Sequence, residues 1–477
     1  MLTARRTTLA AAGVMMLYLW GASAFAQQSA APAGRVREFT VQEAVGYALA
    51  NYPAVRAAIE QYNAARAGVG VAQTNYLPRL DGVWQADRGS RESVLGVLLP
   101  QSPNILTGTQ GSVTPHSYRP FWTSGAGFLL SWEPFDFGYR GAQVRSARST
   151  ESRSQAQIAV TQLGVASAVA DAALAVLADE QRVNASLADV NRRQIFTKSV
   201  HALVDAHLRP GADASRADAE LAASRTRLIL SQQATDEGEA TLAQLLGLAG
   251  SSVRIKTGPF LEIPSDQPLA GAVAEHPVAV AQQKRVEEEK ARISVLNHAY
   301  SPHVTTESLI SARGSGETST GSVKPGAGGL GFDVYNWEAG LTVSMDVSSF
   351  FAIRERKKVE VANRRREEAT YAQTIQTLTG QQQVALAELD GARRVAQNTP
   401  TELAASEQSE TQALARFKAG LGTIVDVAEA QGLLAQAEVD DSLARLSIWR
   451  ALADLDAANG DIAPFLHTAD NMAPGGH

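Results

Sequence analysis

The sequence of 477 residues contains no cysteine. This absence excludes disulfide bonds, cysteine-ligated metals, cysteine nucleophiles and an N-terminal lipidated cysteine. Any attachment to a membrane must therefore come from the polypeptide itself. Its histidines form no metal-ligand pattern, and no nucleophile elbow, phosphate-binding loop or dinucleotide fingerprint occurs. We therefore predict no catalytic residue, no metal site, no cofactor and no enzymatic activity.

Positive charge is in slight deficit, with 43 Lys and Arg against 49 Asp and Glu. Nucleic-acid binding requires clustered cations that neutralise phosphates, so we expect no nucleic-acid partner. One basic run exists, formed by Arg354, Arg356, Lys357, Lys358 and residues 364–366. This run either lies near a membrane interface or a lumen, or it is an ordinary solvated helix face.

Long apolar runs are also missing. After residue 26 no segment has 18 uninterrupted apolar residues, so we expect no transmembrane helix in the mature chain. A chain of this kind can cross a membrane only as a closed β-barrel.

The N-terminus has the features of an export signal. Arg5 and Arg6 precede an apolar stretch over residues 9–20, and residues 24–26 supply a small-x-small cleavage pattern. This arrangement predicts a signal peptide over residues 1–26. A retained anchor helix is the alternative, but the apolar stretch is short for a bilayer.

The chain is internally duplicated. Pro277, Tyr300 and Pro302 follow Pro53, Tyr76 and Pro78 at one constant offset of 224 residues. We therefore predict a first structural repeat over 27–268 and a second over 269–465, followed by a flexible tail over 466–477. Each repeat contains a helix (41–75 and 269–299), two strands joined by a polar loop, and a long helical hairpin.

The helical stretches are unusually long. Residues 139–209 contain no proline, and one continuous helix there would reach about 100 Å. The predicted arms are 139–208 and 213–247 in the first repeat, and about 352–417 and 424–459 in the second. Gly211 and Gly420 fall at the two reversals, where glycine tolerates a left-handed conformation. We therefore predict coiled-coil hairpins with glycine at both tips.

Strict alternation of apolar and polar residues marks two strands, over 122–132 and 335–346; weaker strands fall at 79–90 and 303–313. The apolar faces predict lipid-facing side chains, as in a barrel in lipid: Trp122, Phe128, Leu130, Trp337, Leu341 and Val343. A soluble sheet packed on a core is the alternative. Four strands cannot close a barrel, since about eight are the minimum, so either two or three copies must share one.

The sequence resembles the TolC family of outer-membrane efflux proteins from about residue 40 to residue 460. The most specific match is the second tip, residues 420–430, where glycine and threonine precede an apolar run containing Asp426, with Glu429 beyond it. Residues 135–138 match the family's segment between the second strand and the helix. Residues 210–220 match more loosely, with one apparent extra residue between Gly211 and Ser215.

The resemblance implies a homotrimer with a shared 12-stranded barrel in the outer membrane and a helical tube crossing the periplasm. It also implies that the tips, at Gly211, Ser215, Gly420 and Thr423, dock onto a periplasmic adaptor that connects to an inner-membrane pump. Asp426 and Glu429 would ring a pore constriction, repelling anions and attracting cations. Without the resemblance they would be an acidic pair on a solvated helix face.

We therefore expect an outer-membrane exit duct of a tripartite system that exports small molecules. The alternatives are the outer-membrane component of type I protein secretion and, in a different class, a periplasmic adaptor. An adaptor would carry one hairpin rather than two. Copper or silver export is disfavoured, because soft metals favour Met and Cys ligands and the mature chain offers only Met345 and Met472.

Overall fold

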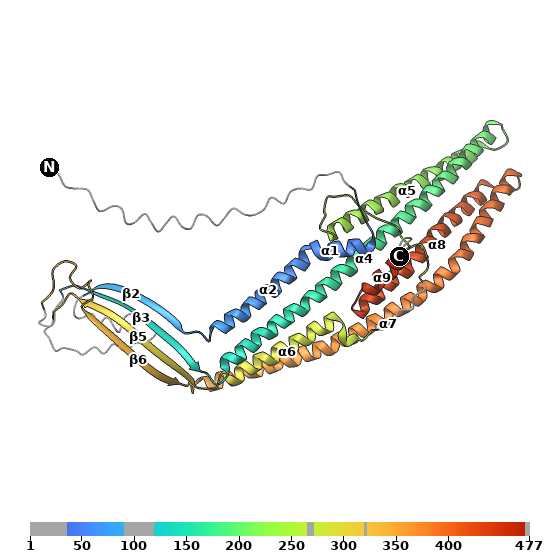
Figure 1. The fold of residues 1–477 in the computed structure, drawn as a ribbon. Coiled ribbons are helices and arrows are strands. Elements are labelled where there is room, and N and C mark those ends of the chain that lie inside the picture. The colour runs from blue at the N-terminus through green and yellow to red at the C-terminus, as the bar shows by residue number, and fades with distance from the viewer. Residues whose placement is uncertain (1–35, 90–118, 265–270, 319–321, 473–477) are drawn as a thin grey trace, which may run out of the picture.

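The computed structural model describes residues 36–89, 119–264, 271–318 and 322–472. A β-sheet forms one end of an elongated molecule, and long helices run from it to two hairpin tips at the other end (Figure 1). The predicted signal peptide, residues 1–26, lies outside the described residues.

The sheet has four antiparallel strands in the order β2-β3-β5-β6. They are β2 (Arg79–Gly89), β3 (Phe121–Phe135), β5 (His303–Ser315) and β6 (Val334–Ser344). The four strands predicted from sequence are confirmed, with ends shifted by a few residues. Strands β2 and β6 are the edges, so each has one side without a partner strand among the residues that the structure describes.

The register aligns the apolar positions of all four strands. Phe128 lies opposite Ile310, and Ile310 lies opposite Trp337. Directly opposite residues point to the same face of a sheet. One face therefore carries Leu80, Trp84, Phe128, Leu130, Ile310, Trp337, Leu341 and Val343, and the other carries Asp81, Gln85, Thr123, Glu307, Arg313 and Glu338.

The apolar face is not covered by any other element of the described part of the chain. Trp337 is 81% exposed and Phe128 is 63% exposed, whereas Trp122 is half-buried beneath the guanidinium of Arg88. A soluble sheet would bury this face against a core of its own. The exposure therefore disfavours the soluble-sheet alternative.

The short helices that precede the strands differ from the prediction in one respect. Instead of continuous helices over 41–75 and 269–299, the structure has α1 (Val41–Asn51) and α2 (Pro53–Thr74), then η1 (Val273–Glu275) and α6 (Pro277–His298). Tyr52 and His276 have extended ψ angles of 129° and 133°. The residue before a proline avoids the helical region, so each helix restarts with proline at its first position.

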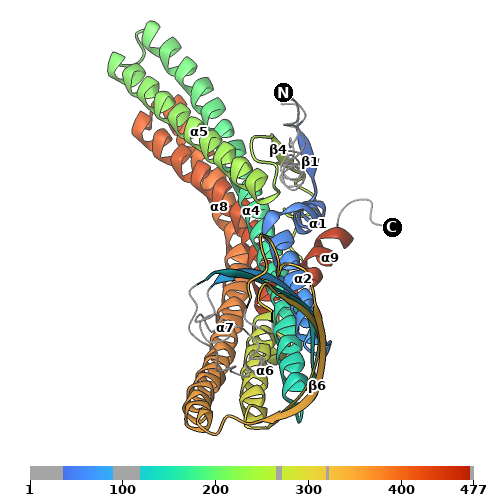
Figure 2. The same ribbon diagram turned by 90° about the vertical axis from the view of Figure 1, so that its left-hand side faces the viewer.

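Two antiparallel hairpins form the rest of the length. They are α4 (Tyr139–Asp205) with α5 (Gly211–Leu245), and α7 (Ser349–Lys418) with α8 (Ile424–Asn459). Helix α4 has 67 residues and is therefore about 100 Å long. Helix α6 lies beside α7, and α2 lies beside α4 (Figures 1 and 2).

The middle of the molecule contains the main core. Ala166, Ala170, Ala173 and Leu177 form a buried seam on α4. By composition one stretch of α4 is long and apolar enough to cross a membrane, but 44% of it is buried within the chain. We attribute this composition to the close helix packing that alanine allows rather than to a span.

Three further elements close this core. A parallel pair, β1 (Arg37–Phe39) with β4 (Val253–Ile255), lies beside α1, and α9 (Ala463–Asn471) follows α8. The prediction of a flexible tail from residue 466 is wrong up to Asn471. Phe465 is buried against Trp449 and Phe260, and this aromatic packing holds the helix; residues 473–477 lie outside the described part.

The helical-hairpin tips as the candidate functional site

The second tip reverses the chain between α7 and α8. Gly420 has a φ of +76°, and the N–H of Leu421 donates to the carbonyl of Arg416 at 2.9 Å. A left-handed residue just past the helix end, followed by this long-range bond, is the Schellman arrangement. The structure thus places Gly420 at the reversal, as predicted.

The first tip uses a different residue type. His207 has a φ of +58°, and the N–H of Leu208 donates to the carbonyl of Leu203 at 2.8 Å. Gly211 is instead the first residue of α5, and Pro210 is its N-cap. The prediction that glycine makes this reversal is therefore wrong. His207 adopts the left-handed conformation instead, which histidine tolerates better than most side chains.

The two tips have the same length. The connections are residues 206–210 and 419–423, and the extra residue expected between Gly211 and Ser215 relative to the family stays a prediction. When the left-handed residues His207 and Gly420 are aligned, Asp213 occupies the position of Asp426, an equivalence that the sequence alone did not reveal.

Asp426 caps the start of α8. Its carboxylate accepts from the N–H of Thr423 at 2.9 Å, and the Thr423 hydroxyl accepts from the N–H of Asp426 at 3.3 Å. This is a capping box that satisfies two otherwise unpaired helix donors. The hydrogen bonds from the Thr423 backbone and side chain lower the pKa of Asp426, and the Arg416 charge adds to the effect.

The acidic pair faces solvent in this chain. Asp426 and Glu429 are both exposed and stand three residues apart on one helix face. Ser215 is also exposed, in the second turn of α5. Both carboxylates are thus accessible from solvent.

Arg209 connects the two tips, a contact that the sequence analysis missed. Its guanidinium donates to the carbonyl of Phe417 at 2.9 Å and lies 4.4 Å from the centre of the Phe417 ring. Cations are favoured at the C-terminal end of a helix and over aromatic faces. Arg209 of the first hairpin therefore stabilises the end of α7 in the second.

An apolar cluster lies beneath this contact. The rings of Phe196 on α4 and Phe417 on α7 meet edge to face, with centroids 5.3 Å apart. Val200, Ile424 and Val427 are buried around them. The two hairpins of the chain are therefore packed together up to their tips.

Ion pairs join the hairpin helices at positions further from the tips than the apolar cluster. Buried Asp189 accepts from Arg193 at 2.9 Å within α4 and from Arg227 of α5 at 3.0 Å. Arg192 makes two bonds of 2.7 Å to Glu438 of α8. Such paired, hydrogen-bonded charges favour one helix register over others.

The exposed ends of the tips are apolar. Leu208 is 70% exposed and Leu421 is 74% exposed, each directly after its left-handed residue. Among the described residues, no group of His, Asp and Glu is arranged to hold a metal ion. The tips therefore expose both acidic and apolar side chains to solvent.

Known proteins match both halves of the chain. The family model of the outer membrane efflux protein matches residues 44–248 and 271–461. OpmQ, the pyoverdine export outer membrane protein of Pseudomonas aeruginosa, is 22% identical over 412 residues, which are 86% of this chain and 82% of that relative.

Solved structures show the same fold. The outer-membrane channel OprN matches with a TM-score of 0.71 and 18% identity, over 90% of this chain and 94% of its own. The CmeC outer membrane channel of Campylobacter jejuni matches with a TM-score of 0.69 and 16% identity, over 91% and 90%. Both hairpin tips lie within the stretches matched by the family model.

Proposed function

This chain belongs to the outer membrane efflux protein family, and from that membership we propose that it forms the exit duct of a tripartite system exporting small molecules. The family consists of outer-membrane channels. The expectations of an outer-membrane location and of no enzymatic activity are therefore confirmed, and the periplasmic-adaptor alternative is set aside.

The observation that carries the proposal is the sheet with one uncovered apolar face and two open edges. In lipid, unpaired edge groups would cost several kcal/mol each. We infer that β2 of one copy pairs with β6 of the next, and that three copies give a 12-stranded barrel around a lumen. The polar face, with Asp81, Glu307 and Glu338, then lines that lumen.

The hairpins continue the barrel as a tube. The order of helix, two strands and long hairpin occurs twice in the chain, which supports the proposed repeats at 27–268 and 269–465. Three copies would supply twelve long helical segments, and α4 is long enough for the tube to extend about 100 Å into the periplasm.

We place the constriction at the second tips. Three copies of Asp426, with Glu429 one turn further, would converge on the axis and attract cations. The exposed position of both residues supports this placement. The capping role of Asp426 is compatible with it, because one carboxylate can accept the Thr423 bonds and still present its charge.

The proposed partners are a periplasmic adaptor at the tips, including Gly211, Ser215, Gly420 and Thr423, and an inner-membrane pump that supplies the energy. The relative OpmQ is named for pyoverdine export, which supports a small-molecule cargo for this chain. No feature of the described residues favours protein secretion over this cargo.

Fractionation and bilayer recording test the proposal together. We expect an SDS-resistant trimer in the outer-membrane fraction, discrete conductance in planar bilayers, and increased toxin sensitivity in a strain that lacks the gene. A water-soluble single subunit without conductance would refute it.

A further inference from the structure

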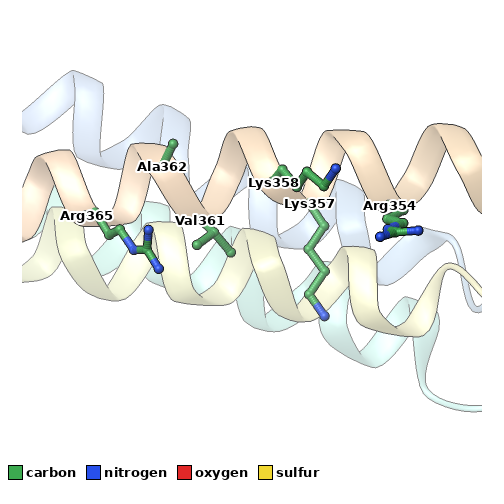
Figure 3. Close-up of a pocket in the computed structure, with 6 residues that line it drawn as sticks. All are labelled: Arg354, Lys357, Lys358, Val361, Ala362 and Arg365. Atoms are coloured by element: carbon green, nitrogen blue, oxygen red, sulfur yellow. The ribbon is translucent and has the colours of Figure 1, made fainter.

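Cationic side chains follow one side of α7 directly after the sheet. Arg354, Lys357, Lys358 and Arg365 line an open hollow together with Val361 and Ala362 (Figure 3). All six residues come from α7, and Lys357 and Arg365 extend over the neighbouring α6. We call the four cations the basic stripe.

Two buried carboxylates of the neighbouring α6, Glu288 and Glu289, are engaged by other cations. Glu288 of α6 pairs with Arg153 of α4 at 2.7 Å and with Arg292 at 2.8 Å, and Glu289 pairs with Arg292 at 3.0 Å. Glu288 and Glu289 are thus paired with cations outside the stripe.

Within the stripe, only Lys358 has a salt bridge in the described part of the chain, to Glu355 at 2.7 Å. Arg354, Lys357 and Arg365 have none there. Arg364 and Arg366, which are close in sequence, pair with Glu368 and Glu367. The charges of Arg354, Lys357 and Arg365 therefore remain available to an external anion, and an anion would share Lys358 with the exposed Glu355.

The stripe begins where the apolar face of the sheet ends. Met345 and Val347 are exposed just after β6, and Phe351, in the first turn of α7, is 72% exposed. Lys358 is seven residues beyond Phe351, which places both on the same side of the helix. An exposed aromatic followed by cations is the pattern of a membrane–water boundary, where long basic side chains extend to the headgroups.

The four cations of the basic stripe lie at different distances from Phe351 along α7. At 1.5 Å per residue, Arg354 and Lys358 lie about 5 Å and 10 Å beyond Phe351, and Arg365 lies about 21 Å beyond it. Arg354, Lys357 and Lys358 therefore stand within side-chain reach of the headgroup layer. Arg365 is too far away for direct contact.

We propose that Arg354, Lys357 and Lys358 bind the phosphate of an anionic phospholipid in the periplasm-facing leaflet of the outer membrane. The inference rests on the proposed placement of the sheet in lipid. Guanidinium and ammonium groups form charge-assisted hydrogen bonds to phosphate oxygens. Each cation near an anionic surface contributes about fivefold to binding, and the three together about 100-fold.

The test uses full-length protein purified in neutral detergent and freed of lipid. Phosphatidylglycerol, zwitterionic phosphatidylethanolamine and inorganic phosphate are titrated separately, and bound lipid is counted by native mass spectrometry. We expect phosphatidylglycerol to bind at least tenfold more tightly than either other probe. Equal binding of phosphatidylglycerol and phosphatidylethanolamine would overturn the proposal, and so would equal binding of inorganic phosphate, which would indicate a free-anion site.

Two triple variants provide the matched comparison. Arg354→Gln/Lys357→Gln/Lys358→Gln should weaken phosphatidylglycerol binding about 100-fold. Arg366→Gln/Arg394→Gln/Lys418→Gln removes the same charge from α7 positions that lie too far beyond Phe351 to reach the headgroups, and it should change binding by about twofold or less. Equal losses in both variants would show a net-charge effect and overturn the proposal.

Planar-bilayer recordings test the remaining possibility, that the basic stripe faces the lumen. If the stripe faces the lumen instead, the first triple variant will shift ion selectivity and leave lipid binding unchanged, which overturns the lipid assignment. Trimer assembly is measured on the same samples. A trimer with conductance but no headgroup preference refutes this inference alone, whereas a soluble single subunit refutes the proposed function. If the first variant does not fold, the comparison of lipids on the unmodified protein still decides.

Discussion

At the scale of single residues, Asp426 both caps the start of α8 and carries an exposed negative charge. Asp426→Asn should keep an acceptor for the Thr423 N–H while removing the charge that we place on the pore axis. We expect weaker cation block and lower cation selectivity in planar-bilayer recordings. Thr423→Val is the control, because it removes the hydroxyl of the capping box and leaves the Asp426 charge.

If Thr423→Val alters selectivity as much as Asp426→Asn does, the effect comes from the helix end rather than from the charge. Unchanged selectivity in Asp426→Asn would remove this residue from the constriction. Glu429→Gln, one turn further, should have a smaller effect of the same sign.

Lowering the pH should weaken the cap at the start of α8. The Thr423 hydrogen bonds lower the pKa of Asp426 below the ordinary 3.8, so the folded state binds this proton less readily than the unfolded state. Its stabilising contribution is complete above the ordinary pKa and is lost as pH falls through the lower, folded-state value.

Hydrogen exchange at residues 423–427, corrected for its intrinsic pH dependence, checks this sign. Protection should persist down to pH 4 and fall below it, and Asp426→Asn should abolish the pH dependence. Protection lost already near pH 6 would indicate that repulsion among copies, which raises carboxylate pKa values, exceeds the effect of the cap.

Arg209 should hold the tips of one subunit together. Arg209→Ala removes the bond to the Phe417 carbonyl and the stacking on its ring, which together contribute about 1–3 kcal/mol. We expect faster hydrogen exchange at residues 415–422 and more frequent channel openings. Arg209→Lys keeps the charge and should retain part of the effect; identical exchange in all three proteins would show that the apolar cluster alone fixes the tips.

At the scale of elements, two glycines of the hairpins form a matched pair. Neither Gly420 nor Gly211 has any atom within 4 Å of an added Cβ, but only Gly420 has a positive φ. Gly420→Ala should therefore destabilise its hairpin by about 1–2 kcal/mol. Gly211→Ala should be neutral or slightly stabilising, because alanine favours helix.

Thermal loss of the folded state, followed by circular dichroism, compares the two variants. Equal melting temperatures for Gly420→Ala and Gly211→Ala would mean that the second tip does not require its left-handed turn.

At the scale of the whole molecule, the absence of cysteine allows a direct test of how the sheet sits in lipid. Trp337 and Glu338 are neighbours on β6 that face opposite sides of the sheet. In intact outer membranes, Glu338→Cys should react with a membrane-impermeant maleimide because it lines the lumen. Trp337→Cys should be protected by lipid; equal reactivity at both positions would contradict the barrel.

Most of the fold follows from sequence periodicity. Alternation with period two located β3 and β6, weaker patterns located β2 and β5, and a long proline-free stretch located α4. Both signals arise from local geometry, since neighbouring side chains in a strand point to opposite faces and a proline-free stretch keeps every backbone N–H available for helical hydrogen bonds. The constant offset of 224 residues predicted the twofold order of elements without any structural information.

The alignment of the first tip depended on backbone conformation and could not be predicted from composition. Gly211 is the nearest glycine, but His207 adopts the left-handed turn. The contact of Arg209 with Phe417 joins residues 208 positions apart, and only helix packing brings them together. The helix α9 likewise depends on aromatic packing against Trp449, which residues 466–471 do not reveal alone.

The sequence by itself determined the strands, the long hairpins, their duplication and the absence of cysteine chemistry, because these depend on periodicity and composition. Only the tertiary structure decided that the apolar positions of four strands share one face, that Asp426 caps α8 and that Arg209 joins the tips. The physical reason is that cross-strand register and contacts between hairpins arise from residues distant in sequence, whose packing no local pattern specifies.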